Sequence, residues 1–533
     1  MPEDEPEDET ARRERGERAE RKRRFLAIAF FAVAAVVGGL LGNGYIGRLP
    51  HHAGYFLVPV DDDVRVPLSV KPRHTVVIVV DGLRRDAAET MMATRLLSGA
   101  GQCRVSDQGS WTVSRPVYAL LSTGLEVDRN GARNNDLTVP LAAESVWQVA
   151  RASGLRVAGS SHLPWFRQLF PDGFDRFNAA VMHEENIFEG GELLDFNLFH
   201  PLYVDDAGHH HGAASLAYAD AVARADREVM ALLAKLDLAR DLVVFTADHG
   251  HTAEGGHGGA QPEIREVLAC FAGVNVARRA DRAPFDGRST APALALLTGL
   301  RFPRHMRAGE DNLDALWELA HFADTDRPYA QDRRAAIDRF REANRGALER
   351  WLGDVPGTWS RLYAREAGAQ TRRRIIASAL AALFFAARLA ERRRRHAPVG
   401  ATATFAWVAF SAVALWVAHR LVLGEFDFTV INLRETYVPG AFAAAGFGVS
   451  ASIAAHRVLV RRAERLGADL VTLVGLILLV NLGHVFVYGW PLGFPLPSAA
   501  ARYFPFFGAF VLVVYGVFGL LLLGGATWRE RRH

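Results

Sequence analysis

Cysteine and lysine are scarce in this 533-residue chain, and two kinds of sequence pattern are missing from it. Only Cys103 and Cys270 are present, which excludes a disulfide-rich scaffold and a cysteine-ligated zinc module. Lysine occurs only at Lys22, Lys71 and Lys235, so nearly all basic residues are arginine. The chain has no N-x-S/T acceptor for N-linked glycans and no internal repeat, which excludes a solenoid. The arginine bias and the missing acceptor together favour a bacterial source with a GC-rich genome.

A large charge surplus is also absent, because the formal net charge is only +3. The charged tail before Phe25 mixes Glu with Arg and predicts a solvated segment, not a basic arm for nucleic acid. We therefore expect no nucleic-acid partner. Cys270 lies in the apolar run 267–273 and is expected to be a buried thiol, while a disulfide with Cys103 is left open.

Apolar residues make up 50% of the chain and are concentrated towards its two ends. This length and composition exceed one soluble domain and indicate a membrane protein. The run 25–42 is apolar over its whole length and follows four basic residues at 21–24. A cleaved signal peptide is the alternative, but a charged tail of this length favours an uncleaved transmembrane anchor.

Further apolar stretches predict five spans, at about 375–390, 399–420, 437–455, 468–490 and 503–526. The first is weak, since only 375–387 is free of charge, and an interfacial helix is its alternative. If it crosses the membrane, the arginine-rich segments 392–395, 457–465 and 529–532 share one side with the basic N-terminal tail, as the positive-inside rule expects.

These spans divide the chain into five parts. We expect a cytoplasmic charged tail (1–24), an anchor (25–42), an extracytoplasmic catalytic α/β domain (43–372, core 74–300), a five-span domain (373–527) and a short cytoplasmic tail (528–533). Both termini would be cytoplasmic, with the catalytic domain in the periplasm beside a bacterial inner membrane.

Two β-branched runs predict the strands on which a site could be built. The run 74–80 ends at Asp81, and the run 242–246 ends just before Asp248. Strands that are apolar on both faces are typical of an α/β sheet with helices on both sides, in which ligands gather at the carboxyl ends of the strands. The fold class expected is therefore α/β, and both carboxylates lie where a site is expected.

Further metal-ligand residues follow at close spacing. Asp205 and His209 lie in D-x-x-G-H-x-x-G, where a glycine-bent loop could turn both side chains towards one ion. Asp248 and His249 lie on a tight turn, and His257 follows after two glycines. Sets of imidazoles and carboxylates suit zinc better than calcium or magnesium. We expect two Zn²⁺ ions, with Mn²⁺ or another divalent metal as the alternative.

The stretch 114–121 predicts the start of a helix, with Ser114 at or near the N-cap and Pro116 in the first turn. A hydroxyl at this place faces a helix N-terminus that favours anions such as phosphate. A neighbouring metal can lower the pKa of the hydroxyl so that it attacks as an alkoxide. Ser114 is therefore the expected catalytic nucleophile.

These residues resemble the alkaline phosphatase superfamily, specifically its type I phosphodiesterase/nucleotide pyrophosphatase branch. In that branch a Ser or Thr nucleophile has proline two residues later and a T-G pair one helix further on, and Ser114, Pro116 and 123–124 keep this pattern. The resemblance implies one zinc held by Asp81, Ser114, Asp248 and His249, and a second held by Asp205, His209 and His257. It also implies that Asn135 binds a phosphate oxygen.

Within the branch, the chain is most similar to the GPI ethanolamine-phosphate transferases. The shared motifs are D-G-L-R-x-D at 81–86, T-x-S-R-P at 112–116, G-H-x-H at 208–211 and F-T-x-D-H-G-x-T-x-x-G-x-H-G at 245–258. The resemblance covers roughly 74–275. Thr112 offers a second hydroxyl and is the alternative nucleophile. A sulfatase is disfavoured, because Tyr118 stands where the sulfatase motif requires arginine.

The resemblance and the spans together predict a membrane-bound, metal-dependent phosphotransferase. It would move phosphoethanolamine, or a similar headgroup phosphate, from a membrane phospholipid to a glycan or glycolipid through a phospho-Ser intermediate. One alternative is a membrane-tethered phosphodiesterase or nucleotide pyrophosphatase that transfers to water. The other is a lipid transporter or scaffold with a vestigial hydrolase domain. The partners expected are the lipid bilayer, the phospholipid donor and the glycan or glycolipid acceptor, and the oligomeric state is left open.

Overall fold

The computed structural model describes most of the chain. The described residues are 9–46, 68–306 without 138, 181, 183–184, 190 and 279–282, scattered positions between 316 and 343, 359–394, 401–424, 426, 429, 434–460, 465–489 and 499–530. These residues form an α/β domain between 68 and 343 and a helical bundle made of α1 and α14 to α18.

A mixed eight-stranded sheet forms the centre of the α/β domain, in the order β4-β3-β5-β1-β6-β7-β2-β8. The strands from β4 to β6 are parallel, β7 runs antiparallel to both of its neighbours, and β8 is parallel to β2. Their bounds are β1 Thr75–Val80, β2 Gly101–Asp107, β3 Val157–Ser161, β4 Arg176–Ala179, β5 Phe196–His200, β6 Leu242–Ala247, β7 Glu266–Gly273 and β8 Phe285–Asp286.

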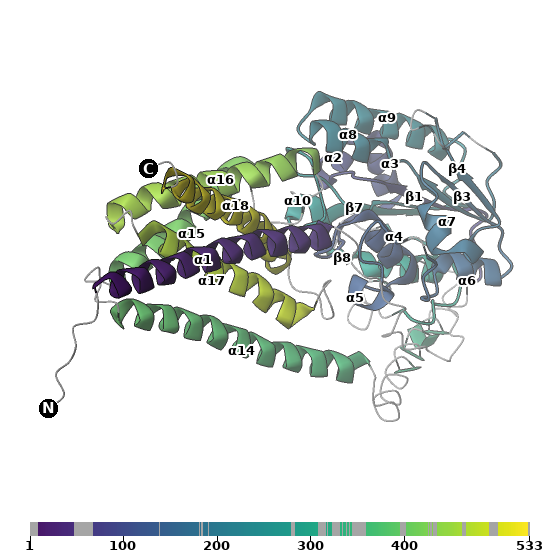
Figure 1. The fold of residues 1–533 in the computed structure, drawn as a ribbon. Helices are drawn as coiled ribbons and strands as arrows, with labels where there is room; N and C mark the ends of the chain where they lie inside the picture. The colour runs from purple at the N-terminus through teal and green to yellow at the C-terminus, as the bar shows by residue number, and fades with distance from the viewer. Residues whose placement is uncertain are drawn as a thin grey trace.

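Helices cover both faces of this sheet, which confirms the predicted α/β class (Figure 1). Val77 and Val79 of β1 point into one apolar core with α4, α6 and α11, while Val76 and Ile78 point into a second core with α3 and α9. The helices of the domain are α2 Arg85–Thr90, α3 Met92–Ala100, α4 Ser114–Thr123, α5 Val127–Asn130, α6 Val146–Ala152, α7 Trp165–Leu169, α8 Tyr203–His211, α9 Leu216–Leu233, α10 Pro262–Arg265 and α11 Thr290–Thr298, with 3₁₀ turns at Pro171–Gly173 and Gly287–Ser289.

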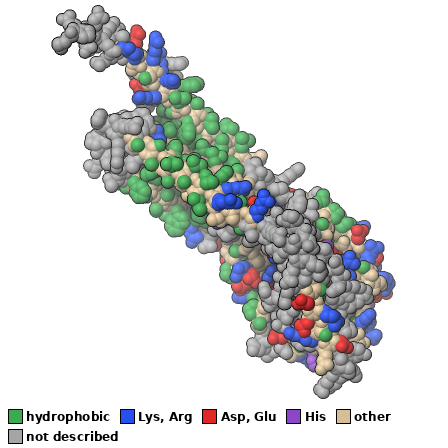
Figure 2. All heavy atoms as spheres, turned by 90° about the horizontal axis from the view of Figure 1, so that it is seen from below, with side chains coloured by type: hydrophobic (Ala, Val, Ile, Leu, Met, Phe, Trp, Pro, Cys, Tyr) green, Lys and Arg blue, Asp and Glu red, His purple; other side chains and the backbone are tan. Residues whose placement is uncertain are grey.

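Most of the large exposed hydrophobic side chains among the described residues lie on the helical bundle (Figure 2). Its helices are α1 Glu9–Ile46, α14 Trp359–Arg394, α15 Ala401–Leu423, α16 Arg434–Leu459, α17 Leu466–Tyr488 and α18 Ala499–Glu530. Among the described residues, five segments are long and apolar enough to cross a membrane: Arg13–Asn43, Ala403–Leu423, Tyr437–Leu459, Leu466–Tyr488 and Ala501–Leu523.

The weak predicted span 375–390 lies in α14, which does not belong to these five segments. Nevertheless, two contacts show that α14 lies along α17. The Phe384 ring packs so close to Gly475 that a Cβ there would meet it at 2.6 Å, and Arg374 donates a hydrogen bond to the Tyr488 hydroxyl. Its side chains Ile375 and Leu383 stay about two-thirds exposed, at 65% and 64%. Such an apolar outer face on α14 is suited to contact with lipid. That α14 forms a sixth span remains a prediction.

The α/β domain lies at one end of the bundle (Figure 1). At the opposite end, the start of α1 and the end of α18 lie on the same side. These two helices are antiparallel and very close: a Cβ at Gly38 would meet the Ala509 carbonyl oxygen at 2.7 Å, and one at Gly516 would meet Ala35 Cβ at 2.8 Å. Glycine at both positions therefore permits backbone contact between the helices.

Cys103 and Cys270 form a disulfide, so the expectation of a buried thiol at Cys270 was wrong. The reason is the register of the antiparallel pair β2 and β7, which places the two residues directly opposite each other. Because 167 residues separate them in the sequence, only the sheet topology reveals the pairing.

Candidate active site

The carboxyl ends of three adjacent parallel strands form the floor of the site. Asp81 directly follows β1, His200 ends β5, and Asp248 directly follows β6. Gly82, at φ +70°, lets α8 pack tightly over this edge, because a Cβ there would lie 2.6 Å from Asp205 Cα. The strand topology thus gathers side chains that are far apart in the sequence.

The first group of potential metal ligands is Asp81, Asp248 and His249, whose ligand atoms all lie within 4.8 Å of one another. His249 Nε2 is 3.1 Å from an Asp248 carboxylate oxygen and 3.5 Å from one of Asp81. Ser114 Oγ lies 3.4 Å from the same nitrogen. The structure therefore brings together all four residues predicted for one metal, and all four are buried.

The hydrogen bonds of this group leave two carboxylate oxygens for an ion. Asp81 Oδ2 accepts from the Tyr118 hydroxyl and bonds His200 Nε2 at 3.1 Å. Asp248 Oδ1 accepts from the backbone N–H groups of Gly82 and His249. Asp81 Oδ1 and Asp248 Oδ2 are buried and have no hydrogen-bond partner. Because unpaired buried carboxylate oxygens are costly, this donor set fits a divalent cation.

Electrostatics supports the same assignment. Burial, together with the charges of Asp81 and Asp205, raises the pKa of Asp248 well above its usual value. Burial lowers the pKa of His249 to about 3, so its imidazole is neutral, which is the form that binds metals. His249 Nδ1 lies 3.2 Å from the Gly250 carbonyl oxygen, which must accept, so the lone pair of Nε2 faces the carboxylates.

The second group is Asp205, His209 and His257. Asp205 and His209 lie one turn apart on α8, so the predicted glycine-bent loop is in fact a helix that presents both residues on one face. His209 Nε2 is 3.4 Å from Asp205 and 3.1 Å from His257 Nε2, and His257 Nε2 is 3.7 Å from Asp205. Burial lowers the pKa of His257 well below its usual value. The rings of His249 and His257 stack at 3.6 Å, which joins the two groups.

His251 also contacts Asp205, although the sequence reasoning assigned it no role. Its Nδ1 accepts from the Gly256 N–H at 3.0 Å, so its Nε2 carries the proton and donates to Asp205 at 2.8 Å. In this tautomer His251 orients the carboxylate, although Asp205, His209 and His251 also lie close enough together to hold an ion. His200 and Tyr118 were missed as well.

Ser114 and Asn135 meet at the N-terminus of α4. Ser114 is the first residue of that helix and Val113 is its N-cap, one residue from the predicted cap position. The Asn135 amide oxygen accepts from the backbone N–H of Arg115, the residue after Ser114, at 2.9 Å, and this bond does not use the Asn135 amide nitrogen. Thr112, in contrast, uses its hydroxyl within the fold: it donates to the Gly259 carbonyl and accepts from the Gly258 N–H.

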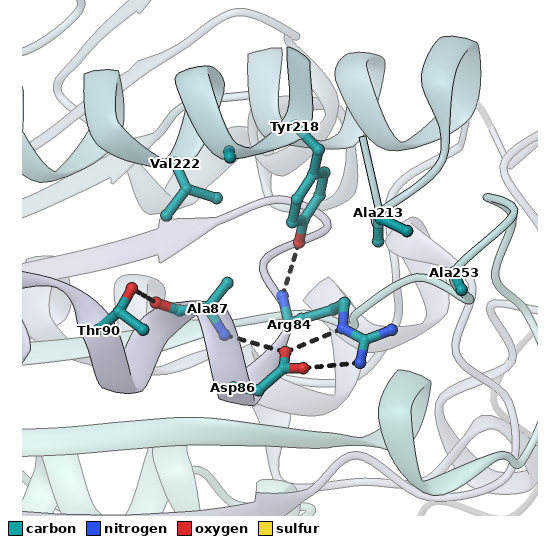
Figure 3. A pocket seen from close by; sticks show the side chains of 10 residues that line it. Arg84, Asp86, Ala87, Thr90, Ala213, Tyr218, Val222 and Ala253 are labelled. Atoms are coloured by element: carbon teal, nitrogen blue, oxygen red, sulfur yellow. Dashed lines mark hydrogen bonds and ion pairs between the residues drawn. The ribbon is translucent and has the colours of Figure 1, made fainter. Parts of the chain in front are cut away.

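A surface pocket of about 480 Å³ lies beside this site but contains none of the potential ligands (Figure 3). Arg84 on its wall pairs with Asp86 at 2.7 Å and donates to the His251 carbonyl oxygen at 3.1 Å. The Tyr218 hydroxyl bonds the Arg84 backbone N–H. Arg84 in the pocket wall therefore stabilises the loop that carries His251, from the side of the loop that faces the pocket.

Comparison with known proteins shows what the α/β domain is similar to. Residues 143–261 match the family model described as type I phosphodiesterase / nucleotide pyrophosphatase. The catalytic subunit of mouse GPI ethanolamine phosphate transferase 3 is 29% identical over 211 residues, which are 36% of this chain and 19% of that protein. The catalytic subunit of human GPI ethanolamine phosphate transferase 2 is 26% identical over 272 residues, 43% of this chain and 26% of that protein. The matches thus span about a fifth to a quarter of these relatives.

Solved structures of low similarity were also found. Human ectonucleotide pyrophosphatase / phosphodiesterase 5 covers 44% of this chain and 96% of its own, with 13% identity and a TM-score of 0.38. A variant of the alkaline phosphatase PafA covers 45% of this chain and 98% of its own, with 11% identity and a TM-score of 0.36. The family match and the transferase relatives show that the α/β domain resembles type I phosphodiesterases / nucleotide pyrophosphatases and the catalytic subunits of GPI ethanolamine phosphate transferases.

Proposed function

We propose that this protein is a membrane-bound phosphotransferase that moves phosphoethanolamine, or a similar headgroup phosphate, from a phospholipid to a glycan or glycolipid hydroxyl. The observation that carries the proposal is the position of Ser114. This residue lies at the N-terminus of α4, beside two carboxylate–histidine groups and close to the end of the bundle that meets the α/β domain. The transferase relatives supply the substrate class.

Two divalent cations, most simply zinc, belong to this proposal. Asp81, Asp248, His249 and Ser114 would hold one, and Asp205, His209 and His257 would hold the other. When bound, such ions withdraw charge from phosphate oxygens and from an attacking hydroxyl.

Ser114 is the proposed nucleophile. Its Oγ forms a bond to phosphorus while the bond from phosphorus to the lipid alcohol breaks, and the departing alcohol takes up the proton that Ser114 gives away. The N-terminal N–H groups of α4 and the Asn135 amide bind the phosphate oxygens. An acceptor hydroxyl then attacks the phospho-Ser, its proton returns to Ser114 Oγ, and the headgroup phosphate leaves on the acceptor.

The proposed location is outside the cytoplasm, with both termini inside. The start of α1 and the end of α18 lie at the end of the bundle that is remote from the α/β domain, which supports this topology (Figure 1). The disulfide between Cys103 and Cys270 also supports it, because such bonds persist in oxidising compartments such as the periplasm. A bacterial inner membrane remains the proposal for the source.

The test of the enzyme uses the purified full-length protein in detergent with bis-p-nitrophenyl phosphate and added zinc. Ser114→Ala should reduce turnover by about a thousandfold or more while the bound metal is retained. Thr112→Val should keep phospho-Ser114 detectable by mass spectrometry, because Thr112 only anchors the backbone of Gly258 and Gly259. Turnover that survives in Ser114→Ala but not in Thr112→Val would make Thr112 the nucleophile.

A second assay separates transfer from hydrolysis, the runner-up that the family model's description favours. Phosphatidylethanolamine labelled in its headgroup is supplied in vesicles together with membrane glycolipids. A transferase moves the label to a glycolipid and leaves diacylglycerol. Release of free phosphoethanolamine, with no labelled glycolipid, would establish a phosphodiesterase.

A further inference from the structure

The segment from Ser110 to Ser114, here called the nucleophile segment, lies between the metal-ligand groups and the membrane bundle. One set of its side chains faces the metal-ligand groups. Thr112 binds the loop at Gly258 and Gly259 through its hydroxyl, and its carbonyl oxygen lies 2.8 Å from His257 Nδ1. Ser114 Oγ approaches His249.

The alternate side chains of the segment face the other way. Trp111 belongs to the apolar core of the bundle, with Tyr437 and Phe506, and Val113 packs against the same core. This alternation is expected of extended backbone such as that of Val113, at φ −105° and ψ 137°. One short stretch of chain thus contacts both the site and the membrane domain.

Arg502, in the first turns of α18, holds the bundle side of the segment. Its guanidinium carbon lies 3.5 Å from the centre of the Trp111 ring, and its Nη2 donates to the Ser110 carbonyl oxygen at 3.1 Å. Both residues are buried, so water screens this cation–π contact little. Trp111 Nε1 donates to the Arg133 carbonyl oxygen at 2.7 Å, which fixes the other edge of the ring.

The start of α18, next to the α/β domain, is hydrogen-bonded to two neighbouring helices. The hydroxyl of Tyr503 lies 2.6 Å from His419 Nε2 on α15 and 3.1 Å from the Tyr437 hydroxyl on α16. His419 also stacks on Phe426 at 3.8 Å. The residue after Arg502 is therefore bound to both α15 and α16, which fixes the part of α18 that carries Arg502.

We propose that the membrane bundle is a working part of the active site, and that Arg502 is a positioning residue that sets the place of Ser114 through Trp111 and Ser110. The inference rests on the proposed role of Ser114 and goes beyond it. It predicts that a bundle residue controls the chemistry even for a small water-soluble phosphodiester, which needs no lipid recognition.

The test compares variants of the full-length protein in detergent. With bis-p-nitrophenyl phosphate, Arg502→Gln should lower kcat and the single-turnover rate of Ser114 phosphorylation by about ten- to a hundredfold, because small displacements of a reacting group cost this much. KM and bound metal should change little. Arg502→Lys keeps a cation over the ring and should recover part of the rate.

Two controls make the result specific. Arg374→Gln removes another bundle arginine over an aromatic ring, that of Tyr488 on α17. Thr429→Val removes a different contact between bundle and α/β domain, the 2.8 Å bond to Gln261. Both should keep the wild-type kcat.

An Arg502→Gln kcat equal to that of the wild type would overturn the inference while leaving the proposed function intact. An equal loss in Thr429→Val would also overturn it, because general docking would then explain the effect. If Arg502→Gln does not fold, Arg502→Lys decides by the same kcat and phosphorylation rates. A wild-type protein without turnover would instead count against the proposed function itself.

Discussion

Asp248 illustrates how single residues in this site depend on an ion. Its carboxylate is buried beside Asp81 and Asp205, and its pKa is raised well above the usual 3.8, first by burial and then by these two charges. A folded-state pKa above the unfolded one means that the metal-free protein loses stability as pH rises through the raised pKa. A bound cation would remove this penalty.

Asp248→Asn should therefore stabilise the metal-free protein and weaken its response to metal. At pH 8 in a chelator, we expect the variant to unfold a few degrees above the chelated wild type, the change expected for about 1–2 kcal/mol. As pH rises above the usual carboxyl pKa of 3.8, its stability should fall less than that of the metal-free wild type. Differential scanning fluorimetry with and without zinc measures both effects, and an undiminished rise of Tm with zinc in the variant would contradict the ligand assignment.

Residues within motifs could be predicted, and residues outside them could not. Asp81, Asp248 and His257 lie in short stretches whose spacing already shows metal-ligand chemistry. His200 has no such neighbours, because it reaches Asp81 only through the pairing of β5 with β1. Tyr118 lies one helical turn after Ser114, and this spacing could have identified it.

At the scale of elements, the contact between α1 and α18 depends on glycine. Gly38→Leu should destabilise the bundle by about 1–3 kcal/mol, because its side chain would collide with the backbone of Ala509. Gly39→Leu is a matched control, since a Cβ at Gly39 meets nothing within 4 Å. Thermal unfolding in one detergent compares the two variants, and equal losses would show that helix propensity, not packing, is responsible.

The connection between α6 and the segment after α11 should respond to acid. Glu144 accepts from Arg301 at 2.6 Å and from the Arg304 N–H at 2.9 Å. Burial opposes ionisation, but these bonds outweigh it and hold the pKa of Glu144 below the usual 4.5. The stabilisation is thus present above pH 4.5 and is lost as pH falls through the lowered pKa.

Glu144→Gln should accordingly cost about 1–3 kcal/mol at pH 7 and much less below pH 4. Urea unfolding at both pH values measures the difference, with Glu192→Gln, an exposed glutamate, as the control. A cost that does not change with pH would assign the effect to packing and not to charge.

Elements with local signals were predicted well. The apolar runs before Asp81 and Asp248 are β1 and β6, buried on both faces as expected. α8 was mistaken for a loop, since its glycine and three histidines are weak helix formers and its packing on the site decides its form. The antiparallel strand β7 and the disulfide follow from non-local pairing, for which a single sequence gives no signal.

For the whole molecule, the predicted topology puts the end of α14 and the turn between α16 and α17 on the cytoplasmic side. A reporter that is active only in the cytoplasm, fused after His396 or at 463, should be active. The same reporter at 491 should be inactive. Activity at 491 but not after His396 would contradict this topology, because either the whole orientation would be inverted or α14 would not cross the membrane. The same reporter fused within the α/β domain separates the two cases, since it is active only if the orientation is inverted.

Hydropathy located the five apolar segments but not how they assemble. The pairing of α1 with α18, and of α14 with α17, is set by small residues that permit close approach, such as Gly516 and Gly475. Such residues are frequent throughout the spans, so composition alone does not identify partners. The contacts between the α/β domain and the bundle include that of Arg502 with Trp111, and no sequence motif marks either residue.

The pairing of α1 with α18 also sets an order of events during biosynthesis. Residues 47–498 separate the two helices, so α1 stays in the membrane without this partner until all of them have been made. The α/β domain can meanwhile fold outside the membrane, but the helix that carries Arg502 arrives only afterwards. Insertion of α18 would then complete both the bundle and the support of the nucleophile segment, so that a half-made chain displays a folded domain without a working catalyst.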